Sequence, residues 1–474
     1  MAQILIAAAH KSSGKTSVSI GLVAAMANRG LAVQPFKKGP DYIDPLWLGR
    51  AAGNACFNLD FFTMSHTEIR TCFNTHSAAS DICLIEGNKG LFDGLDVAGT
   101  DSNAALAKLL SVPVVLVIDT IGMTRGIAPL INGYLDFDSG VNISGVILNK
   151  VGGSRHEAKL RAALERYTDT EVLGAIGRDQ ALEIPERHLG LVPANESGDA
   201  DETIARLATA VSDGINIDQL LEIAKTGAAS VPDATARPAM TVSDVRIAIA
   251  RDAAFSFYYQ DDLEAFAKAG AELVPFDTLN DNALPEVDGL FIGGGFPETH
   301  LPALAQNQSL REDIRQRLID GMPAYAECGG LMYLSQNIRW QNEAFDMVGT
   351  VPGDIIVEKR PQGRGYVVLQ ETGHGLWPAA IETHDKSSKQ IPAHEFHYAR
   401  LDLQRSTPDY AYDVIRGDGI DGEHDGLIIG NLVAGFVHQR NTSSNPWVDR
   451  FVAFVRNKCN DNGIKNEDET SHIS

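Results

Sequence analysis

The stretch A-Q-I-L-I-A-A-A-H-K-S-S-G-K-T, residues 2–16, decides the fold of the first part of the chain. Its first eight residues form a short apolar run, which is typical of a strand buried in a parallel sheet. A small polar loop and G-K-T follow, and apolar residues then recur at helical spacing from Val18 to Met26. A strand, a glycine-containing loop and a helix in this order predict a cradle for phosphate groups.

The phosphate loop gives roles to four of its residues. We expect Ser13, Gly14, Lys15 and Thr16 to bind ATP, because backbone N–H groups and a helix N-terminus hold anions and the lysine reaches the terminal phosphates. The Thr16 hydroxyl is also a predicted Mg²⁺ ligand. The first glycine of the usual motif is absent, and Ala8 stands in that region.

Charged motifs lie where two further predicted strands end. F-K-K-G-P-D-Y-I-D-P covers residues 36–45, and I-E-G-N-K-G-L-F-D-G covers residues 85–94. We expect Asp41 and Glu86 to hold Mg²⁺, directly or through water, while Lys37 neutralises a phosphoryl or carboxylate oxygen. The alternative for the first motif is a charged Gly-Pro turn.

A weaker signal ends the strand predicted over residues 143–148. The sequence there is G-V-I-L-N-K, and Asn149 follows the strand directly. We assign Asn149 to ATP binding, as a reader of the adenine edge.

The order of elements predicts two α/β domains. The first, residues 1–226, alternates strands and helices as a doubly wound, P-loop NTPase-like sheet with its sites at the carboxyl ends of the strands. Predicted strands lie at 3–9, 32–36, 81–86, 113–118, 143–148 and 172–176, with helices at positions such as 103–111 and 155–167. A linker over 227–243, a second doubly wound domain over 244–456 and a disordered acidic tail over 457–474 complete the prediction.

The second domain contains A-Y-A-E-C-G-G-L-M-Y-L, residues 324–334. This pattern predicts a strand, a sharp turn and a helix, with the Cys328 thiol at the apex and small residues where the backbone is crowded. A helix N-terminus stabilises a thiolate, so Cys328 is a candidate nucleophile. The alternative is a buried, inert cysteine.

Two other segments supply partners for this thiol. In F-I-G-G-G-F-P-E, residues 291–298, we expect the N–H groups of Gly294 and Gly295 to stabilise an oxyanion. A thiol nucleophile needs a base, and His438, which follows a strand-like run, is our candidate. His394 and His397, in A-H-E-F-H-Y, are rival bases, and their spacing is too short for a helical zinc motif.

Composition limits the classes of protein that fit. A chain of 474 residues with 44% hydrophobic residues and no long apolar run predicts two to three soluble domains and no membrane span. No secretion signal is recognised, and five cysteines without a C-x-x-C pair favour the reducing cytoplasm. A net charge of −22 disfavours nucleic acid and anionic membrane as partners. A homodimer is left open.

A nucleotide-cleaving half and a thiol half together indicate amide formation. A carboxylate is a poor electrophile until it is phosphorylated. The thiol half releases ammonia from glutamine through a thioester, and ammonia then attacks the acyl phosphate.

The chain resembles the cobyrinic acid a,c-diamide synthase family over nearly its whole length. The matching motifs are the G-K-T loop, F-K-K-G-P-D-Y-I-D-P, E-G-x-x-G-L-F-D-G, G-G-G-F-P-E, A-E-C-G-G-L-M-Y-L, H-E-F-H-Y and a final histidine followed by S-N-P. The first half is also similar to dethiobiotin synthetases and the second to class I glutamine amidotransferases.

This resemblance implies a reaction and a set of roles. It implies ATP, Mg²⁺ and L-glutamine as co-substrates or cofactors, and a tetrapyrrole polycarboxylate whose a and c acetates are amidated. It makes Cys328 the nucleophile and His438 its base, and it gives Lys15 and Thr16 phosphate contacts. Substrate contacts are assigned to Lys37, Tyr42, Asp44, Asn88 and Lys89.

The sequence departs from the family pattern at three places. Ala8 replaces the first loop glycine, and Asn88 and Lys89 replace the usual Val-Met. The latter change makes sirohydrochlorin or sirohaem an alternative substrate. No carboxylate lies two residues past His438, so we expect a Cys-His dyad rather than a triad with glutamate.

Two readings from other classes compete. A partition-type P-loop ATPase switch predicts a lysine five residues before Lys15, where the sequence has His10. A catalytically dead amidotransferase module is disfavoured by the intact surroundings of Cys328.

Overall fold

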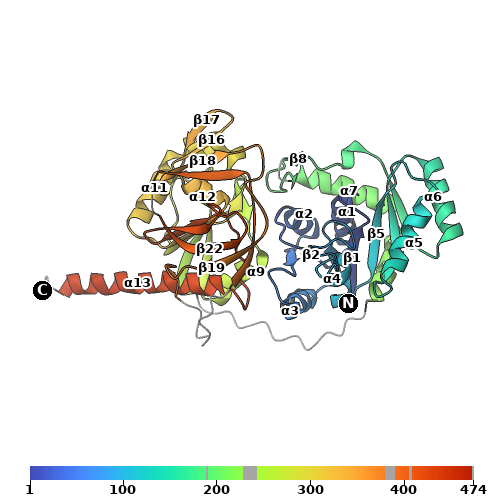
Figure 1. Cartoon of the computed structure of the whole chain (residues 1–474), viewed down its shortest axis with the longest axis horizontal. Coiled ribbons are helices and arrows are strands. Elements are labelled where there is room, and N and C mark those ends of the chain that lie inside the picture. The colour runs from blue at the N-terminus through green and yellow to red at the C-terminus, as the bar shows by residue number, and fades with distance from the viewer. Residues whose placement is uncertain (188–189, 228–242, 379–389, 405–407, 472–474) are drawn as a thin grey trace. The chain divides into compact units, whose positions relative to one another are not determined.

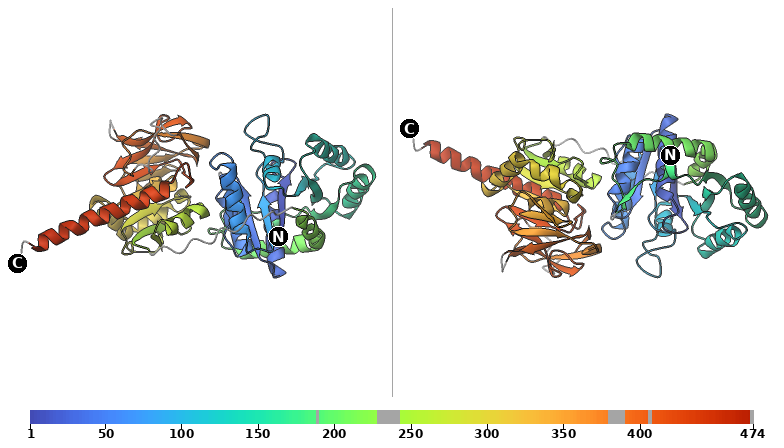
Figure 2. Two further views of the ribbon diagram at one scale, coloured as in Figure 1. Left: turned by 90° about the horizontal axis from the view of Figure 1, so that it is seen from below. Right: turned by 90° about the horizontal axis from the view of Figure 1, so that it is seen from above.

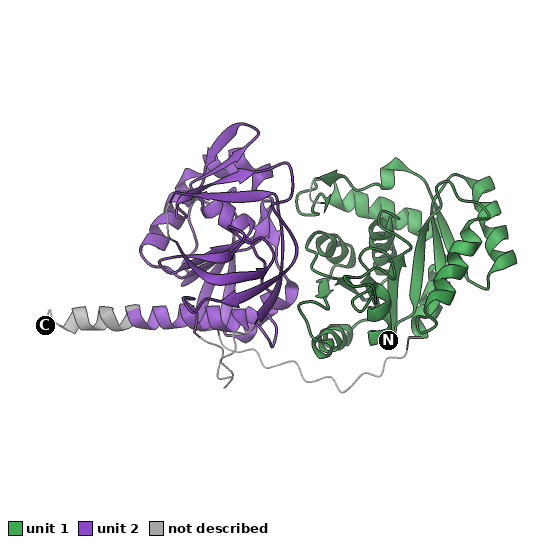
Figure 3. Ribbon diagram, in the orientation of Figure 1, with its two compact units in different colours: residues 1–236 green, residues 237–474 purple. Residues whose placement is uncertain are grey.

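The computed structural model describes residues 1–187, 190–227, 243–378, 390–404 and 408–471, with side chains of the last helix described to residue 461 (Figure 1). The chain divides into two compact units, residues 1–236 and 237–474 (Figure 3). This boundary falls within the predicted linker, which lies outside the described residues except at its two ends. Across the described part of the chain, no helix is long and apolar enough to cross a membrane.

Unit 1 is built on a seven-stranded, fully parallel sheet. Its strand order is β3-β2-β4-β1-β5-β6-β7, so β1 lies between the two halves of the sheet. All six predicted strands are present, and the short β3 was not predicted. The strands are β1 Ala2–Ala8, β2 Val33–Lys38, β3 Phe57–Leu59, β4 Ile82–Glu86, β5 Val114–Asp119, β6 Ile143–Val151 and β7 Val172–Gly177.

Helices cover both faces of this sheet, and the layers can be followed in Figure 2. On β1, Ile4 and Ile6 pack into the core shared with α1, α2, α7 and α8. Leu5 and Ala7 point into the opposite core, shared with α3, α4, α5 and α6. The helices are α1 Lys15–Asn28, α2 Ile43–Ala52, α3 His66–Ser77, α4 Asn103–Leu110, α5 Ile127–Phe137, α6 Ser154–Tyr167, α7 Ala200–Gly214 and α8 Ile217–Lys225; η1 Gln180–Leu182, β8 Glu186–Arg187 and β9 Gly190–Leu191 are short elements. The doubly wound prediction for this unit is confirmed.

Unit 2 contains a nine-stranded mixed sheet of order β12-β10-β13-β15-β24-β23-β22-β19-β20. The first five strands are parallel, as predicted for an α/β domain, and the last four continue the sheet in antiparallel fashion. Short connections join β22 to β23 and β23 to β24, and strands joined in this way pair antiparallel. The strands are β10 Val245–Ala250, β12 Ala271–Phe276, β13 Gly289–Ile292, β15 Ala324–Glu327, β19 Gly363–Glu371, β20 Gln390–His397, β22 Asp409–Arg416, β23 His424–Ile429 and β24 Leu432–Gly435.

Smaller elements complete unit 2. A four-stranded sheet joins β17 Glu343–Asp346, β16 Asn337–Trp340, β18 Gly353–Val357 and β21 Ala399–Leu403, and β11 Phe255–Phe257 pairs with β14 Gly294–Gly295. Ala248 and Ala250 of β10 belong to the core that contains residues of α10, α11 and α12, while Ile247 and Ile249 belong to the core that contains residues of α9 and α13. The helices are α9 Gln260–Lys268, η2 Pro297–Thr299, α10 Leu301–Gln306, α11 Gln308–Ile319, α12 Gly329–Leu334 and α13 Trp447–Ser471.

The predicted disordered tail, residues 457–474, is replaced by helix over most of its length. α13 begins at Trp447 on the core of unit 2 and continues to Ser471. Once a packed turn has nucleated a helix, each added residue gains one hydrogen bond, so the helix extends past its buried part. The final residues, 472–474, lie outside the described residues.

Gly174 offers a test of the packing in unit 1. A Cβ added at this position would lie 2.1 Å from the Gly214 carbonyl oxygen and 2.6 Å from Ile215 Cα, both in the backbone. We expect Gly174→Ala to lower the free energy of unfolding by about 2–3 kcal/mol through overpacking. The measurement is urea unfolding of unit 1, followed by amide hydrogen exchange.

Gly133 is the matched control, because an added Cβ there meets nothing within 4 Å inside α5. Gly133→Ala should stabilise the helix by about 0.5–1 kcal/mol. Equal stability of the two variants would contradict the packing seen at Gly174.

Candidate active sites

The phosphate loop leaves β1 and enters α1 through a left-handed turn. Gly14 has a φ of 79° at the N-terminus of α1, a conformation that favours glycine. A Cβ on Gly14 would lie 2.2 Å from Asn149 Nδ2, so space also demands glycine here. The Ser13 hydroxyl donates to the His10 carbonyl oxygen at 2.8 Å and closes the loop.

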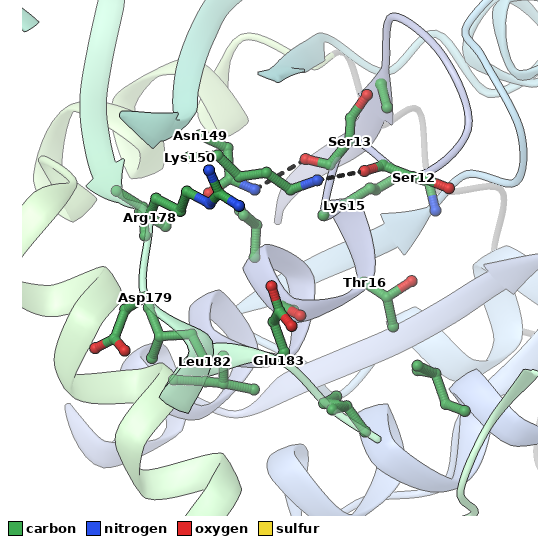
Figure 4. A pocket seen from close by; sticks show the side chains of 18 of the residues that line it. Ser12, Ser13, Lys15, Thr16, Asn149, Lys150, Arg178, Asp179, Leu182 and Glu183 are labelled. Atoms are coloured by element: carbon green, nitrogen blue, oxygen red, sulfur yellow. Dashed lines mark hydrogen bonds between the residues drawn. The ribbon is translucent and has the colours of Figure 1, made fainter. Parts of the chain in front are cut away.

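The ends of β5 and β6 hold this loop in place (Figure 4). Asn149 Nδ2 donates to the Ser13 carbonyl oxygen at 2.8 Å. Lys150 Nζ donates to the Ser12 carbonyl oxygen at 2.8 Å and pairs with Asp119 at 2.9 Å. Asn149 therefore positions the phosphate loop, and reading of an adenine edge stays a prediction.

Charged residues meet beside the loop at the ends of β2 and β4. Lys15 Nζ and the Thr16 hydroxyl each lie 2.7 Å from Glu86 Oε1, and Lys37 Nζ lies 3.1 Å from the same oxygen. Lys37 also pairs with Asp44 and lies 3.8 Å from Asp41 Oδ2. The structure thus brings together the side chains that the strand-end motifs singled out.

Burial and mutual attraction set the charges in this cluster. Burial lowers the pKa of Lys37, but the carboxylates of Asp44, Glu86 and Asp41 outweigh it and raise that pKa above its usual range. Burial raises the pKa of Glu86, yet Lys15 and Lys37 lower it to about 2. For Asp44, burial and the neighbouring Asp41 raise the pKa to about 7, against the pull of Lys37. An added cation would favour the ionised form of Asp44.

The donor set of this cluster fits Mg²⁺. Glu86 Oε2 is buried and has no hydrogen-bond partner among the described residues. Within the described ranges, no three His, Cys, Asp or Glu side chains form a metal cage. Mg²⁺ needs no such cage, because it takes one or two carboxylates together with phosphate oxygens and water. Thr16 and Glu86 are the predicted residues that would hold it, and Asp44, 3.4 Å from the Thr16 hydroxyl, is a further candidate. Asp41 accepts from the Ile43 and Asp44 N–H groups through Oδ1, and its predicted role as a metal ligand stays a prediction.

A cavity of about 950 Å³ extends from the phosphate loop along residues 176–186 and α7. This volume is that of a small-molecule site. Figure 4 shows Arg178, Asp179 and Glu183 around the cavity, and none of the three was predicted from the sequence. The sequence pattern that could have indicated them is weak, because it consists only of a polar segment directly after β7.

The loop after β4 carries the residues assigned to substrate. Asn88 Oδ1 accepts from Lys38 Nζ at 3.3 Å, and Asn88 N–H donates to Asn103 Oδ1 at 3.0 Å. Lys89 has a φ of 35° and lines the cavity, while Tyr42 is buried at the start of α2. The side-chain oxygen of Asn88 therefore has a hydrogen-bond donor within the protein. Asn103, which holds the loop, was not predicted.

In unit 2, Cys328 lies at a strained turn between β15 and α12. Its φ of 48° and ψ of −102° are unusual for a residue with a side chain. Its N–H donates to the Gly435 carbonyl oxygen of β24 at 2.7 Å, which fixes the turn. A Cβ on Gly330 would lie 2.2 Å from the Ile292 carbonyl oxygen, so the predicted need for a small residue there is confirmed.

The predicted oxyanion loop lies between this turn and His438. A Cβ on Gly294 would lie 2.6 Å from His438 Cε1, and one on Gly329 would lie 3.1 Å from the Gly295 nitrogen. The glycines of this loop are thus required by close packing. The structure brings the turn, the loop and the histidine into one site.

The structure separates the three candidate bases. His438 follows β24 and faces the glycine loop. His394 stacks on it with ring centroids 5.0 Å apart, and burial lowers the pKa of His394 well below its usual value. His397 stacks on Phe436 instead and bonds through Nδ1 to the Ala399 carbonyl oxygen at 2.7 Å. Of the three histidines, His438 is the one that lies against Gly294 of the glycine loop, and its role as the base of Cys328 stays a prediction.

The prediction of a dyad without a carboxylate is wrong. Glu327 Oε2 lies 3.3 Å from His438 Nδ1. This carboxylate comes directly before Cys328 in the sequence and not after the histidine. The residue two positions past His438 is Arg440, which pairs with Asp261 at 2.7 Å. The missed signal was an acidic residue at the end of an apolar strand.

Burial opposes the stabilisation of a Cys328 thiolate that the helix N-terminus was expected to give. Burial raises the pKa of the Cys328 thiol above its usual range, and Glu298 adds to the shift. The N–H of Gly329 opposes this shift only in part. These effects favour the protonated form of the thiol.

Comparison with known proteins matches both units to families. Residues 4–192 match the CobQ/CobB/MinD/ParA nucleotide binding domain, and residues 246–446 match the CobB/CobQ-like glutamine amidotransferase domain. Among solved structures, a glutamine amidotransferase aligns with 44% of this chain and 98% of its own, at 14% identity and a TM-score of 0.31, too low to carry an argument.

Curated relatives match nearly the full chain. The cobyrinate a,c-diamide synthase of Magnetococcus marinus is 44% identical over 462 residues, which cover 96% of this chain and 97% of the relative. Proteins of the same name from Archaeoglobus fulgidus and Methanosarcina acetivorans are 40% and 39% identical, over 95% and 92% of this chain and 96% and 92% of their own. The chain therefore belongs to the cobyrinate a,c-diamide synthase family.

Proposed function

We propose that this protein, a glutamine-dependent ligase that forms C–N bonds, amidates the a and c acetate side chains of cobyrinate with ATP. The observation that carries the proposal is the presence of a phosphate site and a Cys-His site in one chain that aligns end to end with its relatives. Cobyrinate is the substrate in the names of those relatives. Five free cysteines and a net charge of −22 support a location in the cytoplasm.

In unit 1, the loop and Lys15 bind the ATP phosphates, and Lys37 faces the carboxylate to be activated. The acetate oxygen attacks the γ-phosphorus, the bond to ADP breaks, and an acyl phosphate forms. Mg²⁺ at Thr16 and Glu86 supplies charge neutralisation on the phosphates when it is bound. Ammonia then attacks the carbonyl carbon, and inorganic phosphate leaves.

In unit 2, His438 takes the thiol proton as the Cys328 sulfur attacks the glutamine amide carbon. N–H groups of the Gly294–Gly295 loop receive the oxyanion. His438 returns the proton to the leaving ammonia, and a thioester remains. Water activated by the same histidine releases glutamate. Low dielectric around the site strengthens each of these interactions.

Sirohydrochlorin or sirohaem is the second candidate substrate, because Asn88 and Lys89 depart from the family pattern. The bond from Lys38 to Asn88 favours cobyrinate, since that polar group is satisfied within the protein. Residues 4–192 match a nucleotide-binding domain whose description also includes MinD and ParA. A partition-type switch is nevertheless disfavoured, because residues 246–446 match an amidotransferase domain.

The glutamine site can be tested apart from synthesis. Cys328→Ala should reduce glutamine hydrolysis and glutamine-dependent amidation by at least about 10³-fold, because the nucleophile is lost. Amidation with ammonium chloride should be unchanged. His424→Asn, on the partly exposed face of β23, is the control and should keep both activities. Hydrolysis that survives in Cys328→Ala would refute the assignment.

A substitution in the phosphate site should have the opposite effect: it should impair ATP-dependent amidation and leave glutamine hydrolysis intact. Lys15→Met should lower ATP-dependent amidation by ammonia about 10²–10³-fold, because a donor to the terminal phosphates is lost. Glutamine hydrolysis should persist. Lys159→Met, on the exposed face of α6, serves as the control. Normal ATP turnover in Lys15→Met would place the nucleotide elsewhere.

Mass spectrometry identifies the macrocycle. With ATP, Mg²⁺ and glutamine, cobyrinic acid should lose about one mass unit for each of two amidations, whereas sirohydrochlorin and sirohaem stay unchanged. Asn88→Val with Lys89→Met should leave this preference as it is. A wild type that amidates only a sirohaem-type ring, or a double variant that gains cobyrinic acid, would make the second candidate correct.

A further inference from the structure

Glu327 is a buried carboxylate at the carboxyl end of β15, directly before Cys328. The residue is 4% exposed. Oε1 accepts from the Tyr325 hydroxyl at 2.7 Å and from the Gln439 N–H at 2.9 Å. Oε2 lies 3.3 Å from His438 Nδ1. Both carboxylate oxygens are therefore engaged, and the second points at the imidazole.

We propose that Glu327 is the positioning residue of the glutamine site, and that it holds His438 with its proton on Nδ1 and its lone pair on Nε2. This inference rests on the proposed roles of Cys328 and His438. In this role Glu327 acts through the histidine and makes no contact with the substrate.

The orientation of the ring supports this role. The Nδ1 edge of His438 faces Glu327, while a Cβ on Gly294 would lie 2.6 Å from Cε1 and 3.3 Å from Nε2. Nε2 is thus directed toward the glycine loop. A carboxylate that accepts from Nδ1–H fixes this tautomer and stabilises the imidazolium that forms during attack.

Sheet topology explains how a residue next to the nucleophile reaches its base. β15 and β24 are parallel neighbours, and Glu327 is in register with Gly435. His438 follows three residues later, at the same edge of the sheet. Arg440 occupies the position two residues past His438, so no carboxylate stands there. Its side chain is fully buried, pairs with Asp261 and lies over the Tyr259 ring at 4.6 Å.

The surrounding hydrogen bonds keep Glu327 in place. Gln439 Nε2 donates to the hydroxyls of Tyr325 at 3.1 Å and Tyr412 at 3.0 Å. Asn445 Nδ2 donates to Gln439 Oε1 at 3.1 Å. Asn445 of the terminal S-N-P motif therefore supports the carboxylate through Gln439, three hydrogen bonds away from the histidine.

His394 restrains the ring from its flat side. Its ring lies at 17° to that of His438, and the two backbones exchange hydrogen bonds of 2.8 and 3.2 Å. Stacking fixes the plane of the His438 imidazole, but it still allows the ring to rotate by half a turn about the Cβ–Cγ bond, which would move Nδ1 to the opposite side. The bond to Glu327 removes that freedom, because only Nδ1 meets a carboxylate.

The test is Glu327→Gln in the full chain, which preserves size and removes the charge. We expect kcat for glutamine hydrolysis to fall about 10²–10⁴-fold, as when a triad carboxylate becomes an amide, with KM within about twofold. Alkylation of Cys328 by iodoacetamide should slow by at least about tenfold. Glu327→Asp should recover part of kcat. Amidation by ammonium chloride should equal that of the wild type.

Glu395→Gln is the matched control. Glu395 is a buried carboxylate in the same unit, but it accepts from the Asp418 and Gly419 N–H groups and lies 3.6 Å from His397 instead. It should keep kcat for glutamine.

Three results would overturn the inference: wild-type kcat in Glu327→Gln, equal losses in Glu395→Gln, or loss of the ammonium chloride reaction together with the glutamine reaction. Failure of the proposed function looks different, because glutamine hydrolysis would then survive in Cys328→Ala.

Discussion

Both sites depend on one constraint, the crowding of the backbone at the turn that begins the helix after a buried strand. At such a turn there is no room for large side chains, and the helix N–H groups point outward. Gly14 meets the constraint with a left-handed φ, and Cys328 meets it with a strained one supported by Gly330. The first turn presents N–H groups to an anion, and the second presents a thiol. The two sheets differ in their second halves, but this local geometry is common to them.

Burial has opposite consequences in the two units. Around Glu86 the effect of burial is compensated by Lys15 and Lys37, so the carboxylate and the lysines stay charged inside the protein. These charges suit the site to binding phosphate and a metal ion. Around Cys328 burial raises the pKa of the thiol, and the carboxylates of Glu298 and Glu327 add to the shift. The first site is therefore suited to holding charge, and the second, under the proposed function, would work by moving a proton through His438.

Sequence patterns predicted the features that depend on local order. The strands of unit 1, the loop at Gly14 and the turn at Cys328 follow from apolar periodicity and from glycine spacing. Glu327 was missed because its role depends on the pairing of β15 with β24, which no local pattern encodes. The raised pKa of Cys328 was missed because burial is a property of the whole fold. Arg178 was missed because the loop after β7 has no glycine or motif to distinguish it.

The glutamine site draws on strands that are far apart in the chain. Glu327 and His438 are 111 residues apart in sequence, and the backbone of β20 reaches His438 through a single bridge at His394. Contacts of such long range form late, because loop-closure entropy opposes them until the sheet is nearly complete. We therefore expect glutamine hydrolysis, the activity proposed for this site, to require the completed domain, because a partly folded chain would hold the thiol without His438 beside it.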